Sequence, residues 1–164
     1  MNITELTLDE LSKRCKNATI TIAAAESVTA GYLQFLLSQM PSALDIFNGG
    51  ITAYNIGQKV KHLNLDYIEA AKCNCVSKET AETMAIKAAE LFNSKMGIGI
   101  TGYASPVPEK DVTELYAYMA IYLNNKVVHS YKLHSKETSA AEAQKDYALQ
   151  VVTEVLSYLE GIRS

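Results

Sequence analysis

A buried strand that runs directly into a helix constrains this sequence more than any other feature. Residues 18–25 read Ala-Thr-Ile-Thr-Ile-Ala-Ala-Ala, a nearly continuous run of apolar and β-branched residues. Such runs are typical of a strand that is covered on both faces, as in parallel sheets. The following residues open a helix that we predict over 29–40, because Pro41 cannot continue it. The strand and helix together indicate an α/β fold.

The rest of the chain continues this alternation of elements. Further strands are predicted over 47–55, 96–101, 115–123 and 126–133, and further helices over about 6–15, 56–63, 77–93 and 138–159. Thr7 and Ser77 are the expected N-caps of two of these helices, and Asn124-Asn125 is a hairpin signal. Residues 64–74 read as turns. The order predicts a three-layer α/β/α sandwich with a mixed sheet, in a single domain over residues 1–164.

Composition excludes several classes of function. A net charge of -3 and a pI near 5.6 are not those of a nucleic-acid-binding protein, which usually carries a basic face. No apolar run is long enough to cross a bilayer, and the first residues lack the features of a secretory signal. Three cysteines and three histidines, with Cys73 and Cys75 as the one close pair, fall short of a zinc site. We therefore expect a cytoplasmic protein without metal or cofactor, and without nucleic-acid or membrane partners.

A serine and a lysine are the candidate chemical groups. Ser27 follows the first strand, and a hydroxyl at such a turn lies at the rim of a sheet, where backbone N–H groups point outward. Lys59 follows the second predicted strand and could serve as a base for that hydroxyl. The alternatives are plain ones: Ser27 as a helix cap and Lys59 as a solvated side chain. Neither S-x-x-K nor G-x-S-x-G occurs here, so the fold has to bring Ser27 and Lys59 together.

Residues 97–102, Gly-Ile-Gly-Ile-Thr-Gly, match the dinucleotide-binding pattern G-x-G-x-x-G. That site requires a strand before the glycines and a helix after them. Here the glycines lie within a predicted strand that leads into a loop with Pro106 and Pro108. We reject dinucleotide binding and predict that these glycines let a neighbouring helix or loop pack closely.

Four segments resemble one protein family. Ala25-Glu26-Ser27-Val28-Thr29-Ala30-Gly31 resembles the A-E-S-C-T-G-G signature of the CinA C-terminal domain family, whose members include competence/damage-inducible proteins and nicotinamide-nucleotide amidases. Residues 47–54 together with Lys59 are similar to its F-x-G-G-x-x-x-Y-S-N-x-x-K stretch. Val76-Ser77 and Thr101-Gly102 lie where the family has A-V-S and T-G. The resemblance extends over essentially the whole chain.

The resemblance implies a metal-free amidase that converts the carboxamide of nicotinamide mononucleotide to the acid and ammonia. By position, Ser27 would be the nucleophile, Lys59 its base and Tyr54 a third residue of the catalytic site. N–H groups over 29–31 would face the oxyanion. The implied substrate-binding residues are Glu26, Thr29, Gly31, Gly50, Thr101 and Gly102. The implied partner is a small carboxamide, a nicotinamide nucleotide or nucleoside, and the family likeness favours a homo-oligomer.

Two segments depart from the family pattern. The loop after Gly102 is rich in glycine in the family, whereas residues 103–111 contain no glycine and two acidic groups. The family's G-D-R-x-x-x-R run before the last helix is replaced by residues 135–142, which contain no arginine; the chain's two arginines are Arg14 and Arg163. Two explanations remain open. In the first, the protein is an amidohydrolase that acts on a substrate with less phosphate or holds the phosphate through Lys110, Lys132 or Lys136. In the second, it is a catalytically impaired relative that acts as a ligand-binding or scaffold protein.

Overall fold

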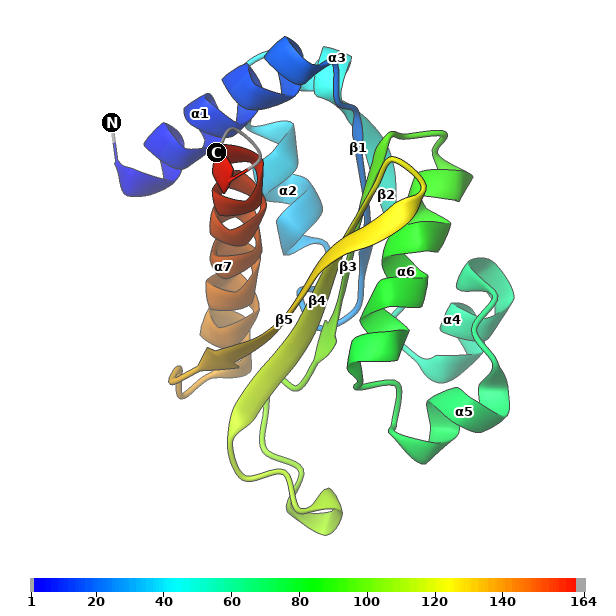
Figure 1. Cartoon of the computed structure of the whole chain (residues 1–164). Helices are drawn as coiled ribbons and strands as arrows, with labels where there is room; N and C mark the ends of the chain where they lie inside the picture. Colours follow the sequence, from blue (N-terminus) through cyan, green and yellow to red (C-terminus); the bar gives the residue numbers. More distant parts are fainter. Residues whose placement is uncertain (1, 162–164) are drawn as a thin grey trace.

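Helices cover both faces of a five-stranded sheet in the computed structural model, which describes residues 2–161. The strand order is β2-β1-β3-β4-β5. Helices α1, α2 and α7 lie on one face, and α4, α5 and α6 lie on the other (Figure 1). The strands are β1 (Ile22–Glu26), β2 (Phe47–Thr52), β3 (Met96–Gly102), β4 (Leu115–Leu123) and β5 (Lys126–Ser135). The helices are α1 (Ile3–Ala18), α2 (Tyr32–Ser38), α3 (Ala43–Ile46), α4 (Ile56–Leu63), α5 (Tyr67–Lys72), α6 (Lys78–Leu91), the 3-10 turn η1 (Pro108–Lys110) and α7 (Ala140–Gly161).

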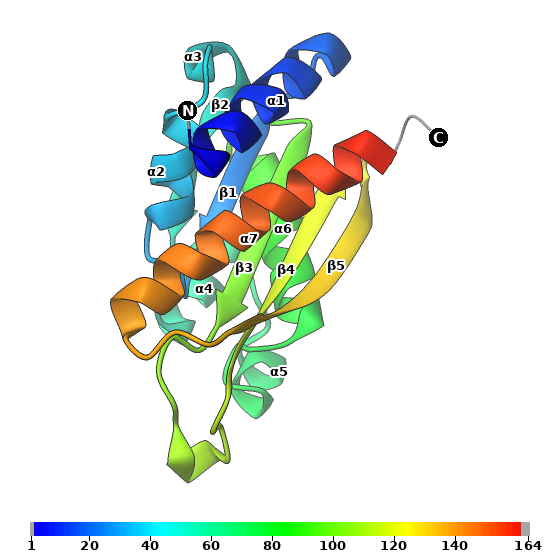
Figure 2. The same ribbon diagram turned by 90° about the vertical axis from the view of Figure 1, so that its left-hand side faces the viewer.

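The sheet is mixed, which confirms the predicted fold class. β1 pairs in parallel with β2 and β3, while β3, β4 and β5 pair antiparallel. Asn124 and Asn125 connect β4 to β5 with positive φ at both positions, the conformation that a tight hairpin turn demands. Because β1, β2 and β3 are parallel, their carboxyl ends meet at one edge of the sheet. The connection between β3 and β4 extends beyond that same edge (Figure 2).

Alternation along β1 separates two packing layers. Ala24 belongs to the large apolar core under α1, α2 and α7, together with Ile98 and Ile100 of β3. Ala23 and Ala25 belong to a smaller core beneath α4 and α6. Every residue of β1 is buried, as expected for a central strand with helices on both faces.

Gly97 and Gly99 allow α6 to lie close against β3. A Cβ at Gly97 would stand 1.9 Å from the Ala85 carbonyl oxygen, and one at Gly99 would stand 2.2 Å from the Ala81 carbonyl oxygen. Both distances are far shorter than any van der Waals contact. The packing prediction for these glycines is confirmed.

Several element boundaries differ from the prediction. α1 is capped by Asn2, whose side chain accepts from the Glu5 N–H, and Thr7 lies inside the helix with its hydroxyl on the Ile3 carbonyl. α1 also extends to Ala18, so β1 begins four residues later than predicted. α2 is shorter than predicted, and α5 occupies part of the stretch that was read as turns. The predicted range of α4 and the Ser77 cap of α6 are confirmed.

No helix of the described residues is both long and apolar enough to span a membrane.

Candidate active site

Ser27 lies at the carboxyl end of β1 on the face covered by α4 and α6. Its N–H donates to the Ile100 carbonyl, and the neighbouring Ala53 N–H donates to the Glu26 carbonyl. These bonds continue the pairing of β1 with both flanking strands one step past the last strand residue. Because side chains alternate along a strand, Ser27 follows Ala23 and Ala25 onto the same face. The sheet therefore fixes the direction of the Ser27 hydroxyl.

Lys59 reaches that hydroxyl from α4. Asn55 caps α4 through its side chain, which accepts from the Gln58 N–H, and Lys59 lies in the first turn of the helix. Lys59 Nζ lies 2.8 Å from Ser27 Oγ and 2.9 Å from the Tyr54 carbonyl oxygen. The predicted proximity is confirmed, across 32 positions of sequence. The distance is within the range that direct proton transfer requires.

Burial makes the charged form of Lys59 unfavourable. The side chain is 3% exposed, and none of the carboxylates in residues 2–161 forms an ion pair with it. Removal from water therefore lowers the pKa of Lys59 from its ordinary value of 10.5, and proximity to Cys75 offsets this effect only in part. A lysine with a lowered pKa next to a hydroxyl can act as a general base near neutral pH.

Tyr54 contributes its main chain to this arrangement. Its carbonyl oxygen accepts from Lys59 Nζ and also lies 3.4 Å from Ser27 Oγ. The phenol ring is 64% exposed, although Tyr54 does line the cleft in front of Ser27. Tyr54 therefore contacts Lys59 and Ser27 through its main-chain carbonyl.

The Ser27 hydroxyl opens into a cleft of about 420 Å³. Thr101 and Gly102 at the end of β3 line this cleft, in agreement with their predicted place. The Thr101 hydroxyl donates to the Cys75 carbonyl at 2.7 Å and so fixes the turn before α6. Cys75 and Tyr103 also line the cleft; sequence reasoning missed both, since neither forms part of a pattern with Ser27.

Glu26 is placed away from the cleft, which corrects its predicted role in substrate binding. It is completely buried on the opposite face of the sheet, where its carboxylate accepts from the N–H groups of Gly31, Leu33 and Gln34 and from the Thr29 hydroxyl. These donors lie at the start of α2, whose N-terminus attracts negative charge. Glu26 therefore caps α2.

Three further predicted substrate contacts are also corrected. The Thr29 hydroxyl and the Gly31 N–H both donate to Glu26 and are not available to a ligand. A Cβ on Gly50 would stand 2.7 Å from both the Ala24 carbonyl oxygen and the Gln34 side chain, so Gly50 serves the packing of β2.

The N–H groups that could serve as oxyanion donors lie nearer to Ser27 in sequence than predicted. The Ala30 N–H donates to the Ser27 carbonyl, and the Gly31 N–H is taken by Glu26. Within residues 2–161, the N–H groups of Val28 and Thr29 have no acceptor. Val28 also lines the cleft. The main chain directly after Ser27 is thus the part of this turn with N–H groups to offer.

Known proteins match this chain in sequence and in fold. The family model of the CinA C-terminal domain matches residues 5–156. The chain belongs to the CinA family. A competence-damage inducible protein of Streptococcus equi subsp. zooepidemicus is 40% identical to this CinA-family chain over 107 residues, which are 65% of the chain and 25% of that relative. The match thus spans about a quarter of the curated relative's length.

Solved structures of CinA proteins share the fold of this chain. A competence or damage-inducible protein from Enterobacter asburiae superposes with a TM-score of 0.88 at 18% identity, over 97% of this chain and 99% of that chain. A CinA superfamily protein from Escherichia coli superposes with a TM-score of 0.86 at 21% identity, over 94% of this chain and 90% of that chain. At these identities the likeness concerns the fold alone.

Metal-ligating side chains do not gather in this CinA domain: across residues 2–161, no group of three His, Cys, Asp or Glu residues is arranged to hold a metal ion.

Proposed function

We propose that this CinA-family chain is an amidohydrolase that uses Ser27 and Lys59 to hydrolyse a small carboxamide. The observation that carries the proposal is the 2.8 Å contact between Ser27 Oγ and Lys59 Nζ in a buried site without a carboxylate partner in the described structure. A purely structural role does not account for such burial, because desolvation of an amine without an ion-pair partner opposes folding. A lysine that has to work as a neutral base requires that environment.

The first step forms an acyl-enzyme. Neutral Lys59 takes the proton of the Ser27 hydroxyl, and Oγ attacks the carbonyl carbon of the substrate. The carbonyl π electrons move onto oxygen, which becomes an oxyanion. The Val28 and Thr29 N–H groups are the donors nearest to Ser27 in sequence that have no other acceptor. A single oxyanion donor of this kind contributes about 3–4 kcal/mol in comparable enzymes.

Collapse of the intermediate releases ammonia. The Lys59 ammonium returns its proton to the amide nitrogen as the C–N bond breaks, so ammonia leaves and an ester on Ser27 is left. A water molecule then gives a proton to Lys59 and attacks that ester. Ser27 Oγ departs and recovers its proton from Lys59. The net reaction converts one carboxamide and one water into a carboxylic acid and ammonia.

The test is ammonia release from a panel of carboxamides that includes nicotinamide mononucleotide and nicotinamide riboside. We expect Ser27→Ala to reduce kcat/KM by about 1,000-fold or more, as removal of a nucleophile does in serine hydrolases. Ser38→Ala, an exposed serine on α2, is the matched control and should retain activity. Ammonia release that is unaffected by Ser27→Ala would refute the nucleophile assignment. No release from any member of the panel by the unmodified protein would instead favour a catalytically impaired relative that binds ligands or acts as a scaffold.

A further inference from the structure

The lining of the Ser27 cleft contains almost no fixed positive charge. Among the described residues that form it, Lys59 is the one cationic side chain, and its nitrogen is occupied by Ser27 and the Tyr54 carbonyl. The rest of the wall is apolar or uncharged and includes Val28, Ile56, Val76, Val107, Asn55 and Asn74. A flat ring or a short apolar group fits such a wall. A phosphate dianion would exchange water for a surface whose one amine is already engaged, which is unfavourable.

The loop between β3 and β4 offers few backbone donors in place of the missing charge. Phosphate-binding loops present several free N–H groups toward the anion. Of the eight N–H groups over residues 103–112, five already donate within the chain, to the carbonyls of Tyr116, Val112, Val107, Pro108 and again Val107. The other three belong to Ala104, Ser105 and Glu109, and of these residues only Ala104 is part of the described cleft lining. Pro106 and Pro108 have no N–H to give. Glu109 and Asp111 add negative charge to the same loop.

Two contacts hold this loop in that conformation. The Tyr147 hydroxyl of α7 donates to the Tyr103 carbonyl at 3.0 Å, and Tyr147 is completely buried. At the other end, the Val107 and Val112 main chains pair as a short antiparallel bridge. To turn the five bonded N–H groups toward the cleft, the loop would have to break these bonds. The existing geometry is therefore the one that a substrate meets.

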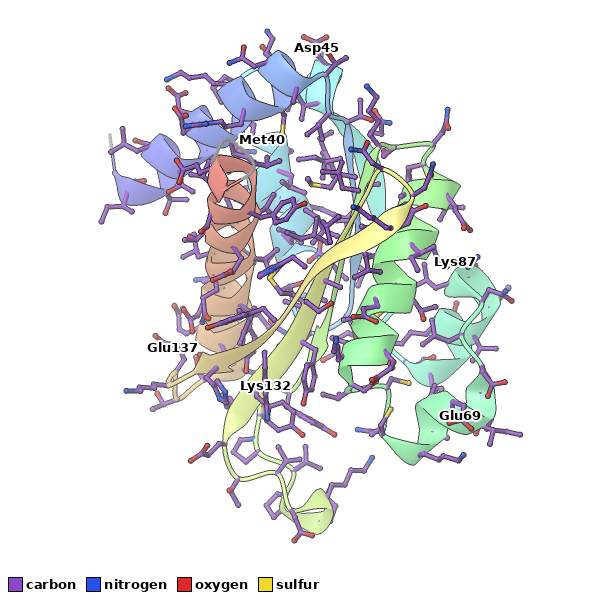
Figure 3. The ribbon with its side chains drawn as sticks, in the orientation of Figure 1. Met40, Asp45, Glu69, Lys87, Lys132 and Glu137 are labelled. Atoms are coloured by element: carbon purple, nitrogen blue, oxygen red, sulfur yellow. The ribbon has the colours of Figure 1, made fainter. Side chains whose placement is uncertain are left out.

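None of the three lysines that could replace an arginine is part of the described lining of the Ser27 cleft. Lys132 Nζ rests 4.2 Å above the ring of Tyr116, an attraction that holds the ammonium on β5. Lys136 lines a separate cavity of about 600 Å³ on the other side of Ala104, where Glu114 and Glu137 offset its charge. Figure 3 places Lys132 on β5 and Glu137 beyond the end of that strand. Lys110 is exposed in η1 and is not part of the described cleft lining, although its charge partly offsets the rise that burial causes in the pKa of Cys75, a residue of that lining.

From these observations we infer that the Ser27 cleft selects carboxamides that carry no phosphate, with the carbonyl attached to a ring or a short apolar group. The inference rests on the proposed amidase function and narrows its substrate class. It distinguishes this chain from a nucleotide hydrolase by the absence of any cation other than Lys59 from the described cleft lining, not by any change in Ser27 or Lys59. The ring would lie against Val28, Ile56 and Val107.

The decisive comparison uses nicotinamide riboside and nicotinamide mononucleotide, which differ by one phosphate. With the unmodified protein, kcat/KM for the riboside should exceed that for the nucleotide by about tenfold or more, the scale of discrimination that loss of a charge partner produces. Equal or better turnover of the nucleotide would overturn the inference and leave the amidase proposal standing. Absence of turnover with both compounds would count against the amidase proposal.

Calorimetric binding to Ser27→Ala tests the selection independently of turnover. The riboside should bind more tightly than the nucleotide, and nucleotide binding should not weaken with added salt, because no ion pair is made in the cleft. Tighter, salt-sensitive binding of the nucleotide would overturn the inference.

Ala104→Arg, at the boundary of the two cavities, should shift the preference toward the nucleotide, whereas the uncharged Ala104→Gln should not. If both variants favour the nucleotide equally, charge is not the selecting property.

Discussion

Glu26 and Ser27 are adjacent in sequence, but their side chains lie on opposite faces of the sheet. The Glu26 carboxylate accepts hydrogen bonds from the start of α2, while the Ser27 hydroxyl meets Lys59 of α4. Strand alternation imposes this separation, because consecutive side chains point to opposite sides. Two consecutive residues therefore supply both the side chain that caps α2 and the candidate nucleophile.

Replacement of Glu26 should affect stability rather than substrate binding. Glu26→Gln substitutes an NH2 group for one of the two oxygens that together accept four hydrogen bonds, so a buried donor is left facing other donors. We expect the free energy of unfolding to fall by about 1–3 kcal/mol, measured by urea denaturation. Glu109→Gln, at an exposed position of η1, is the control. An unchanged unfolding midpoint with a raised KM would restore Glu26 as a substrate contact.

Replacement of Lys59 by methionine should stabilise the protein while it abolishes activity. Burial lowers the pKa of Lys59 below 10.5 in the folded protein. At pH values between this folded-state pKa and 10.5, the unfolded chain therefore binds more protons than the folded protein does. The buried lysine therefore opposes folding fully below its folded-state pKa, and the penalty disappears as the pH rises to 10.5. In a domain of this size, each kcal/mol gained raises Tm by about 2–4 °C. Calorimetry at pH 7 should show a higher Tm for Lys59→Met, and the gain should shrink toward pH 10.5.

Lys61→Met is the matched control for this experiment, since Lys61 lies on the same helix but is exposed. Its Tm should stay close to that of the unmodified protein at every pH. A lower Tm for Lys59→Met than for Lys61→Met at pH 7 would show that Lys59 stabilises the folded protein, which contradicts this prediction.

The rate of hydrolysis should rise with pH. The neutral form of Lys59 is the base, so kcat/KM should increase about tenfold per pH unit below the pKa of Lys59 and level off above it. Lys59→Arg should be inactive over the whole range, because a guanidinium stays protonated. The measurement is ammonia release between about pH 5.5 and 9.5 in buffers of equal ionic strength.

Cys75 supplies the control for the pH profile, because it is the other group near Lys59 whose pKa burial changes, in this case upward. Cys75→Ala should leave the rising limb in place. A limb that vanishes in this variant, or a rate that falls with pH in the unmodified protein, would contradict the assignment of Lys59 as the base.

The close contact between β3 and α6 should not tolerate a methyl group at Gly99. A Cβ there would lie 2.2 Å from the Ala81 carbonyl and 2.6 Å from the Ala85 amide nitrogen, so the helix would have to move away from the strand. We expect Gly99→Ala to lower the free energy of unfolding by about 2–3 kcal/mol or more in urea. For comparison, an added Cβ at Gly161 meets no atom within 4 Å, and Gly161→Ala should be nearly neutral. Equal stability of the two variants would refute this explanation of the glycine pattern.

Local sequence determined much of the architecture. The apolar run before Glu26, the Ser77 cap, the Asn124-Asn125 turn and the bounds of α4 all follow from short-range preferences, and each is present in the structure. The predicted cap at Thr7 was wrong because Asn2 and Glu5 form a better reciprocal pair at the start of α1. The end of the first helix was also misplaced, since Ala18 suits a helix as readily as a strand.

The sequence alone also named Ser27 and Lys59, through their residue types and the family resemblance, but it could not determine their relationship. Only the tertiary structure brings the two side chains to 2.8 Å, withdraws Lys59 from water and directs the Glu26 carboxylate to the opposite face. The physical reason is that desolvation and long-range contact depend on which elements pack together. Hydrophobic periodicity determines helices and strands within a few residues, whereas the state of a lysine depends on groups that lie far away in sequence.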